Sequence, residues 1–177
     1  SPTNPAPSNT AAASSTSPVV ATSASATAPQ PAADADDAAI DAAQKEYLDL
    51  LVRLSPELAT ALGIHTRDTE LDARDPAIWD AQLADEEKML RSLESRFAAP
   101  RASRRARTDL ALMQHQLTVD LCRKRAEKPL ERRPDLYASP MNALFLMAAR
   151  DYAPADERAR NALARIEKVP ALLEQAK

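Results

Sequence analysis

Prolines and a single glycine divide this sequence into helical segments. Eight prolines follow Asp34, and none interrupts a stretch in which apolar residues recur every three or four positions. Because proline lacks a backbone N–H and is tolerated only in the first turn of a helix, each marks a helix boundary. The period-two alternation of strands is absent, as are the Asn-Gly and Asp-Gly pairs typical of hairpins. The sequence therefore predicts an all-α fold, an antiparallel helical bundle.

The apolar pattern predicts where these helices lie. Their expected ranges are 36–54, 56–62, 75–97, 104–128, 140–150, a helix that begins at 154 and a last segment that begins at 170. An irregular connection is expected at 129–139. The residues expected to face the core are Ile40, Ala43, Tyr47, Leu50, Leu51, Leu54, Trp79, Leu83, Leu90, Leu93, Phe97, Leu110, Met113, Leu117, Leu121, Leu163, Ile166 and Val169.

The helix at 140–150 is expected to be buried because it is strongly apolar. Its large apolar residues are Leu144, Phe145, Leu146 and Met147.

The one glycine, Gly63, is predicted to end the short helix at 56–62 and to open a loop at 63–72. Ser55 is expected to cap that helix, and Gly63 to adopt the left-handed conformation that terminates it. His65 and Asp68 follow three positions apart, so their side chains are placed to hydrogen-bond across a turn. This pair is interpreted as a local staple of the loop, with a substrate contact as the alternative, since loops often carry function.

Residues 1–33 differ in composition from the rest of the chain. They contain no charged residue, six prolines and otherwise mostly alanine, serine and threonine. Such a segment has too little apolar surface to offset the entropy of ordering, so a disordered spacer is predicted. The helical domain is then expected over 34–177. An uncharged spacer of this kind often follows a removed export signal. We therefore expect an exported bacterial protein, periplasmic or lipid-anchored at the outer membrane.

The distribution of charge favours pairing within the bundle. Residues 34–99 carry 16 acidic and 7 basic side chains, whereas residues 101–133 carry 4 acidic and 10 basic ones. The helices expected there are antiparallel neighbours, so opposite charges meet along their polar edges. The arginines at 101, 104, 105 and 107 are interpreted as a solvated helix start. An acidic total and a lack of interleaved aromatic residues argue against nucleic acid as a partner.

No residue of this chain is predicted to bind a metal or to act as a catalyst. The two histidines, His65 and His115, lack the His-Glu-x-x-His spacing of a zinc-binding helix, and His115 is expected to be partly exposed. Cys122 is the only cysteine, so no internal disulfide is expected, and its surroundings predict a half-buried residue rather than a nucleophile. No apolar run approaches the ~20 residues of a membrane span.

Two stretches resemble a bacterial family called domain of unknown function 885. The first is Ala59-Thr60-Ala61-Leu62-Gly63-Ile64-His65-Thr66-Arg67-Asp68 through Leu71. The second is Phe145-Leu146 through Ala149-Arg150-Asp151-Tyr152-Ala153-Pro154, followed by Glu157-Arg158. The order and separation of these two signatures also fit, and the resemblance covers about 40–177. The residues interpreted as its structural signature are Gly63, Ile64, Arg150, Asp151 and Pro154.

The resemblance implies a large, mostly helical, often exported protein related to zinc metallopeptidases. The family's His-Glu-x-x-x-Gly-His-His-type motif lies far downstream, and nothing in this chain matches it, so no zinc ligand or catalytic glutamate is assigned here. The expectation is a non-catalytic N-terminal helical region that walls the substrate channel. Its expected partners are the zinc-bearing C-terminal region of the same protein and a peptide substrate. The alternative is a stand-alone exported helical bundle that acts as a protein-interaction module.

Overall fold

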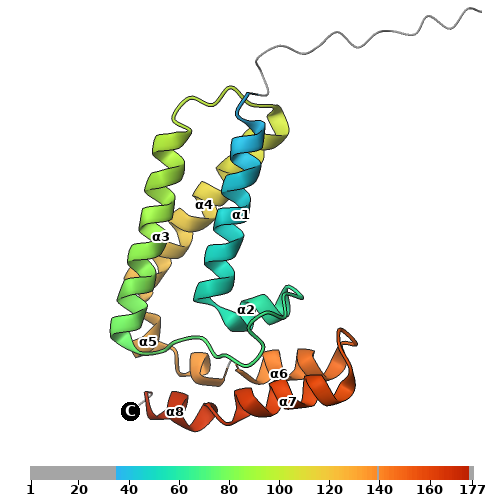
Figure 1. Cartoon of the computed structure of the whole chain (residues 1–177). Helices are drawn as coiled ribbons and strands as arrows, with labels where there is room; N and C mark the ends of the chain where they lie inside the picture. Colours follow the sequence, from blue (N-terminus) through green and yellow to red (C-terminus); the bar gives the residue numbers. More distant parts are fainter. Residues whose placement is uncertain (1–34, 139, 176–177) are drawn as a thin grey trace, which may run out of the picture. The chain divides into compact units, whose positions relative to one another are not determined.

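The computed structural model describes residues 35–138 and 140–175 (Figure 1). The predicted spacer at 1–33 lies outside these residues. In the described ranges the regular secondary structure is helical and contains no strand, which confirms the predicted all-α class. The helices are α1 (Asp37–Leu54), α2 (Pro56–Ala61), α3 (Pro76–Arg96), α4 (Arg104–Glu127), α5 (Pro129–Arg132), α6 (Pro140–Ala149), α7 (Ala155–Ile166) and α8 (Val169–Glu174), with a 3₁₀ helix, η1, at Pro134–Ala138.

Side chains cap the starts of α2 and α3, and the cap of α2 is the Ser55 expected from the sequence. The Ser55 hydroxyl accepts the N–H of Leu58 at 3.2 Å, and Pro56 occupies the first turn of α2. The Asp75 carboxylate accepts two N–H groups of the first turn of α3, at 2.9 and 3.2 Å. Each such cap stabilises its helix by about 1 kcal/mol, because it pairs donors that the helix itself leaves unpaired.

The prediction of an irregular connection at 129–139 was wrong for most of its length. Pro129 starts α5, and Pro134 starts η1. Proline preorganises the first turn of a helix but cannot continue the turn before it, so two closely spaced prolines give two short helices. Neither is long enough to show an apolar period in the sequence.

The main apolar core lies between α1, α3 and α4. In Figure 1, α3 runs antiparallel to α1 and to α4, and α4 passes behind α1. The core is made by the stripes that the sequence predicted, together with small residues at the start of α4. Its buried members are Ile40, Ala43, Leu93, Phe97, Ala102, Ala106, Leu110, Met113 and Leu117.

Opposite charges meet along the edges of this bundle, as predicted. Arg105 of α4 pairs with Asp41 of α1 at 3.0 Å, and Arg125 of α4 pairs with Glu87 of α3. Because these side chains are exposed or partly exposed, each pair stabilises the bundle by only ~0.2–1 kcal/mol. The ion pairs therefore favour this pairing of helices, but they contribute little to the stability of the fold.

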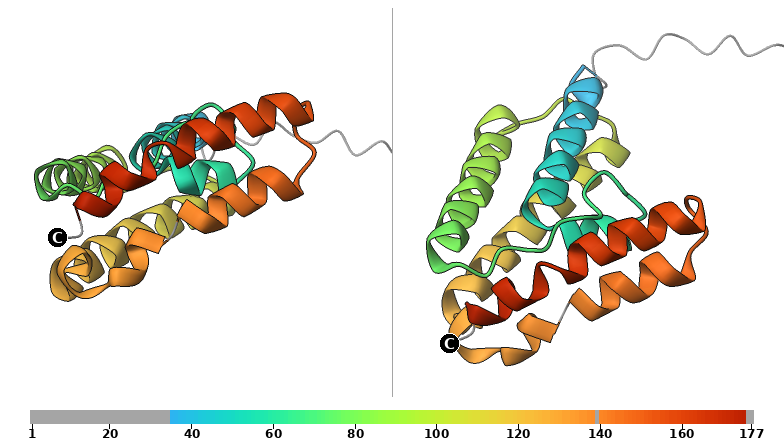
Figure 2. Two further views of the ribbon diagram at one scale, coloured as in Figure 1. Left: turned by 90° about the horizontal axis from the view of Figure 1, so that it is seen from below. Right: turned by 60° about the horizontal axis from the view of Figure 1, so that its bottom comes forward.

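α6 and α7 lie side by side as an antiparallel hairpin, and α8 continues from α7 (Figure 2). The prediction that α6 is buried was only partly right. Pro140, Ala143 and Met147 are buried, whereas Phe145 is 66% exposed. One face of α6 packs against the neighbouring helices, and the opposite face is not covered.

The prediction that α7 points Leu163 and Ile166 inward was wrong. These side chains are 57% and 47% exposed, and the buried residue of α7 is Arg165. The helix is turned this way because the surface beneath it is polar, as the candidate site shows.

Two further residues of α4, Cys122 and His115, have exposed side chains. Cys122 is exposed rather than half-buried, because Leu121 occupies the inward position on α4. His115 lies exposed on the same helix. Among the residues that the structure describes, no helix combines the length and the apolar character needed to cross a membrane.

Candidate functional site

The site is built on the end of α2 and the loop that follows it. Gly63 has φ of +82°, the left-handed conformation predicted for it. Its N–H donates to the Thr60 carbonyl at 3.1 Å, and the Ile64 N–H donates to the Ala59 carbonyl at 2.8 Å, which closes the last turn. Apart from Gly63 itself and its two neighbours in the chain, no atom lies within 4 Å of the place where a Cβ of Gly63 would stand. Glycine is therefore needed there for its backbone conformation and not for space.

His65 and Asp68 form the predicted hydrogen bond, with Nδ1 and Oδ2 2.9 Å apart. Because a carboxylate only accepts, the imidazole carries a proton on Nδ1. The other oxygen of the buried Asp68 accepts the Thr60 hydroxyl at 2.8 Å. The His65 ring stacks on Tyr152, with ring centroids 3.3 Å apart, and its side chain is 21% exposed. The pair thus staples the loop to α2 and to the turn before α7. A substrate contact at His65 and Asp68 stays a prediction.

Arg165, which the sequence analysis missed, lies fully buried beneath this loop. Its Nη2 donates to the Thr60 hydroxyl at 3.0 Å and to the Arg67 carbonyl at 3.1 Å. Its Nε and Nη1 are buried and meet no hydrogen-bond acceptor among the described residues. Burial lowers the pKa of this guanidinium, and the negative charge of Asp68 is the strongest opposing influence.

A second group of charges, of which Glu57 and Arg74 are buried, ties the far end of the loop back to the start of α2. Asp72 accepts the N–H of Glu57 at 2.9 Å and the hydroxyl of Ser55 at 2.7 Å. Glu57 in turn accepts the N–H of Asp72 at 3.2 Å. Arg74 lies 3.6 Å from the Glu57 carboxylate and 3.7 Å from that of Asp72. These reciprocal bonds hold the far end of the loop against the start of α2.

The second signature contributes arginines that cap helix ends. Arg150 donates from Nη1 to the carbonyl of Ala61 at 2.8 Å, although the two residues are 89 positions apart. Arg158 donates to the carbonyls of Ala148 and Arg150 at 3.0 and 2.8 Å, and it pairs with Asp151 at 2.8 Å. The last carbonyls of a helix have no partner within it, so these arginines satisfy the ends of α2 and α6. The two signatures are therefore in direct contact.

Tyr152 has an ionisation that differs from that of a free tyrosine. Burial and the nearby Asp68 carboxylate raise the pKa of its hydroxyl to about 12. The ring that stacks on His65 therefore stays a neutral phenol well above physiological pH.

The polar groups of this site bind one another and do not form a metal centre. In the ranges the structure describes, no three His, Cys, Asp or Glu side chains are grouped to hold a metal ion. Both oxygens of Asp68 and the Nδ1 atom of His65 are occupied by hydrogen bonds within the chain. These residues do not fit a tetrahedral zinc site, and no reaction step through zinc is derived from them.

The two signatures, which are in direct contact, fall within the match to one protein family. A family model described as "Bacterial protein of unknown function (DUF885)" matches residues 56–177, which include both signatures and well over half of the chain. The chain belongs to the DUF885 family. Its match to the DUF885 family begins at Pro56, so α1 lies before it, whereas the sequence resemblance begins near Ile40. No curated protein and no solved structure matches this chain.

The spacing of two arginines is the sequence signal that could have pointed to Arg165 in this DUF885 chain. Arg158 and Arg165 are seven positions apart, so they share a face of α7 that lies away from the apolar stripe. The spacing shows that the two arginines lie together. It does not show that this face, rather than the apolar one, turns inward.

Proposed function

We propose that this chain is the non-catalytic N-terminal helical region of an exported zinc-metallopeptidase-like hydrolase, in which it walls the substrate channel. The observation that carries the proposal is the orientation of α7. Ala159, Leu163 and Ile166 share one face of that helix and are exposed, while Arg165 occupies the buried face. Uncovered apolar faces of this kind mark contact with further protein.

α6 supports the same proposal independently. It contains no charged residue, and Met141 and Phe145, one turn apart, are both exposed. A helix without charge on any face is normally covered on all sides. The hairpin of α6 and α7 therefore presents apolar surface suited to a further part of the same protein, which we propose to be the zinc-bearing region.

The remaining parts of the proposal rest on the sequence. The hydrolase and its zinc come from the family resemblance, and export comes from the uncharged composition of residues 1–33. The proposed substrate is a peptide. His65 is the candidate contact because Asp68 fixes its ring while part of its side chain remains exposed.

Two measurements test the proposal. The reading frame beyond the Lys177 codon should continue into a helix that carries a His-Glu-x-x motif. The purified 177-residue chain should retain no stoichiometric zinc after dialysis and hydrolyse no peptide. Stoichiometric zinc that is lost on changing His65 or His115 would overturn the non-catalytic assignment. A stop codon directly after Lys177 would favour the alternative, a stand-alone exported interaction module.

The channel-wall role has a separate test in the full-length protein. His65→Ala should raise KM for a peptide and leave the zinc content unchanged. His115→Ala, an exposed histidine on α4, is the matched control and should leave KM unchanged. An unchanged KM for both variants would remove His65 from the substrate path.

A further inference from the structure

The middle of α4 carries no charge on a face that the described helices leave uncovered. Residues 110–119 contain no Asp, Glu, Lys or Arg. Leu110 and Leu117 of this stretch are buried in the core. Leu112 and Val119 lie on the opposite face and are 61% and 42% exposed. A solvated helix normally carries charge on its outer face, so this one is suited to burial against another helix.

The exposed face has the repeat of a coiled coil. Its residues follow one another at alternating steps of four and three positions, the seven-residue repeat by which two helices pack along a seam. They lie opposite the stripe that fills the core, since a helix has about 3.6 residues per turn. These six exposed residues, the outer seam of α4, are Thr108, Leu112, His115, Val119, Cys122 and Ala126.

Two hollows open along the outer seam. The one around Cys122 is also lined by Thr118, Leu121 and Arg125, and its volume of about 500 Å³ leaves room for a large apolar side chain. These four residues are spaced as those that form the hole for a side chain of a facing helix. The hollow around Thr108 repeats the same four positions two heptads earlier. The surface therefore has holes of the kind that a second helix fills.

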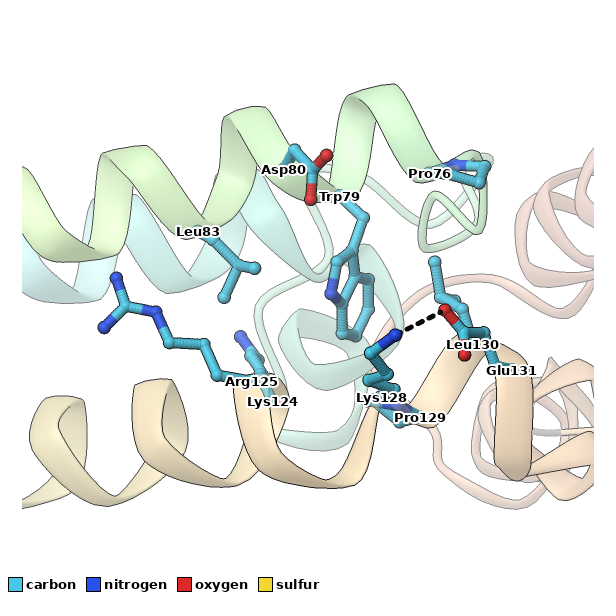
Figure 3. Close-up of a pocket in the computed structure, with 10 residues that line it drawn as sticks. All are labelled: Pro76, Trp79, Asp80, Leu83, Lys124, Arg125, Lys128, Pro129, Leu130 and Glu131. Carbon is cyan, nitrogen blue, oxygen red and sulfur yellow. Dashed lines mark hydrogen bonds and ion pairs between the residues drawn. The ribbon is translucent and has the colours of Figure 1, made fainter.

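The cations beside the outer seam are turned toward α3. In Figure 3, Trp79 reaches from α3 toward α4 at this end of the helix. Lys124 pairs with the buried Glu86, and Arg125 pairs with Glu87. Because these cations are engaged with α3, they leave the outer seam itself uncharged and open.

We propose that the outer seam binds the outer seam of a second copy of this chain, with the two α4 helices antiparallel. The midpoint of Thr108 and Ala126 is also the midpoint of Leu112 and Cys122. A two-fold axis through this point brings Leu112 of each copy to the hollow at Cys122 of the other. One helix thus carries both the side chain and the hole that fits it, which favours a second copy over an unrelated partner. The inference does not rest on the proposed function.

Disulfide cross-linking tests the antiparallel pairing. In Leu112→Cys the new thiol faces Cys122 of the second copy, so mild oxidation should give a covalent dimer on a non-reducing gel. The unmodified chain should not cross-link, because antiparallel pairing places the two Cys122 thiols about 15 Å apart along the helices. Leu112→Cys with Cys122→Ala should not cross-link either, for the same reason.

A second cysteine variant measures cross-linking by chance collision. Glu94→Cys, at an exposed position of α3, retains Cys122 and should give little covalent dimer. A dimer yield in Leu112→Cys no higher than in Glu94→Cys overturns the proposal. So does a strong dimer band from the unmodified chain, which would indicate a parallel pairing.

Sedimentation velocity tests the pairing without a cross-link. Phe145→Glu with Leu163→Glu is the background, because it removes the exposed surface of α6 and α7 as a source of association. Adding Leu112→Glu with Val119→Glu should raise the dimer dissociation constant at least about tenfold, since it places carboxylates in the seam.

The matched control adds Leu48→Glu with Ile78→Glu, two exposed apolar residues of α1 and α3, to the same background. It should leave the dissociation constant unchanged, and circular dichroism shows that each variant is folded. A background chain that is monomeric at about 1 mM, where a weak dimer would still form, overturns the proposal. An equal effect of the two added pairs overturns it as well.

Discussion

At the scale of single residues, Arg165 is the side chain on which the candidate site most depends. It is fully buried, and its Nη2 joins α2 to the loop through Thr60 and Arg67. Its charge also stands near three carboxylates, those of the buried Asp68 and Glu57 and of the partly buried Asp72. Removal of one member of a buried charge cluster leaves the others uncompensated, and this is more damaging than loss of a surface pair.

Arg165→Met should therefore lower the free energy of unfolding by about 3 kcal/mol. Arg160→Met, an exposed arginine on the same helix, should change it by less than about 0.5 kcal/mol. Urea unfolding followed by circular dichroism measures both variants. Equal stability of the two would mean that the buried guanidinium contributes nothing to the fold.

Tyr152 gives the residue-scale prediction for pH. An unfolded tyrosine ionises near pH 10, whereas the folded pKa is about 12, so the folded state keeps a proton that the unfolded state loses. Stability should be fully present below pH 10 and decline as the pH rises toward 12. Tyr47, whose pKa is raised to about 12 mainly by burial, acts in the same direction. Tyr152→Phe should make this decline shallower in urea unfolding, and Tyr152→Phe with Tyr47→Phe shallower still. A decline of unchanged steepness in Tyr152→Phe would contradict the assignment.

At the scale of elements, the end of α2 is stabilised both by a neighbouring residue and by one far away in the sequence. Gly63 supplies the left-handed residue, and Arg150 of the second signature donates to the carbonyl of Ala61. Gly63→Ala should lower stability by about 1 kcal/mol through the backbone alone, since space for a Cβ is available. Gly63→Asn should lose less, because asparagine tolerates this conformation better. A neutral Gly63→Ala in thermal unfolding would show that α2 can end another way.

These elements also show how far the sequence predicts the fold. Ser55, Pro56 and Gly63 act within one or two turns, so the start and end of α2 were predicted from neighbouring residues alone. The orientation of α7 was not, because it depends on groups about a hundred positions away, where Arg165 donates to Thr60 and Arg67. An amphipathic pattern identifies two faces of a helix. Which one turns inward is decided by the surface it meets.

The candidate site also has one part that was predicted from local sequence and one part that was not. The bond between His65 and Asp68 spans three positions and was predicted from that spacing. Its setting was not predicted, since Tyr152 and Arg165 reach it from a later part of the chain. Through these contacts the local bond between His65 and Asp68 becomes part of the contact between the two family signatures.

At the scale of the whole molecule, the described helices leave apolar surface uncovered. Seven of the large exposed apolar side chains belong to α2 with its C-cap residue and to the segment from α6 to α8. They are Leu58, Leu62, Met141, Phe145, Leu163, Ile166 and Leu173. The other four, Leu48, Ile78, Leu112 and Val119, are spread over α1, α3 and α4. The uncovered apolar surface is therefore denser on the shorter helices, at the hairpin and around α2.

The last prediction concerns this uncovered surface. The purified chain should bind a hydrophobic dye or self-associate, because exposed apolar faces of this kind are favoured when covered. Phe145→Glu with Leu163→Glu should reduce dye fluorescence and self-association with little change in unfolding, since both side chains are already exposed. Met147→Glu, on the buried face of α6, is the contrasting variant and should destabilise the fold by placing a charge in the interior. A monomeric chain without dye binding, measured by light scattering and fluorescence, would contradict an uncovered interface and favour an autonomous module.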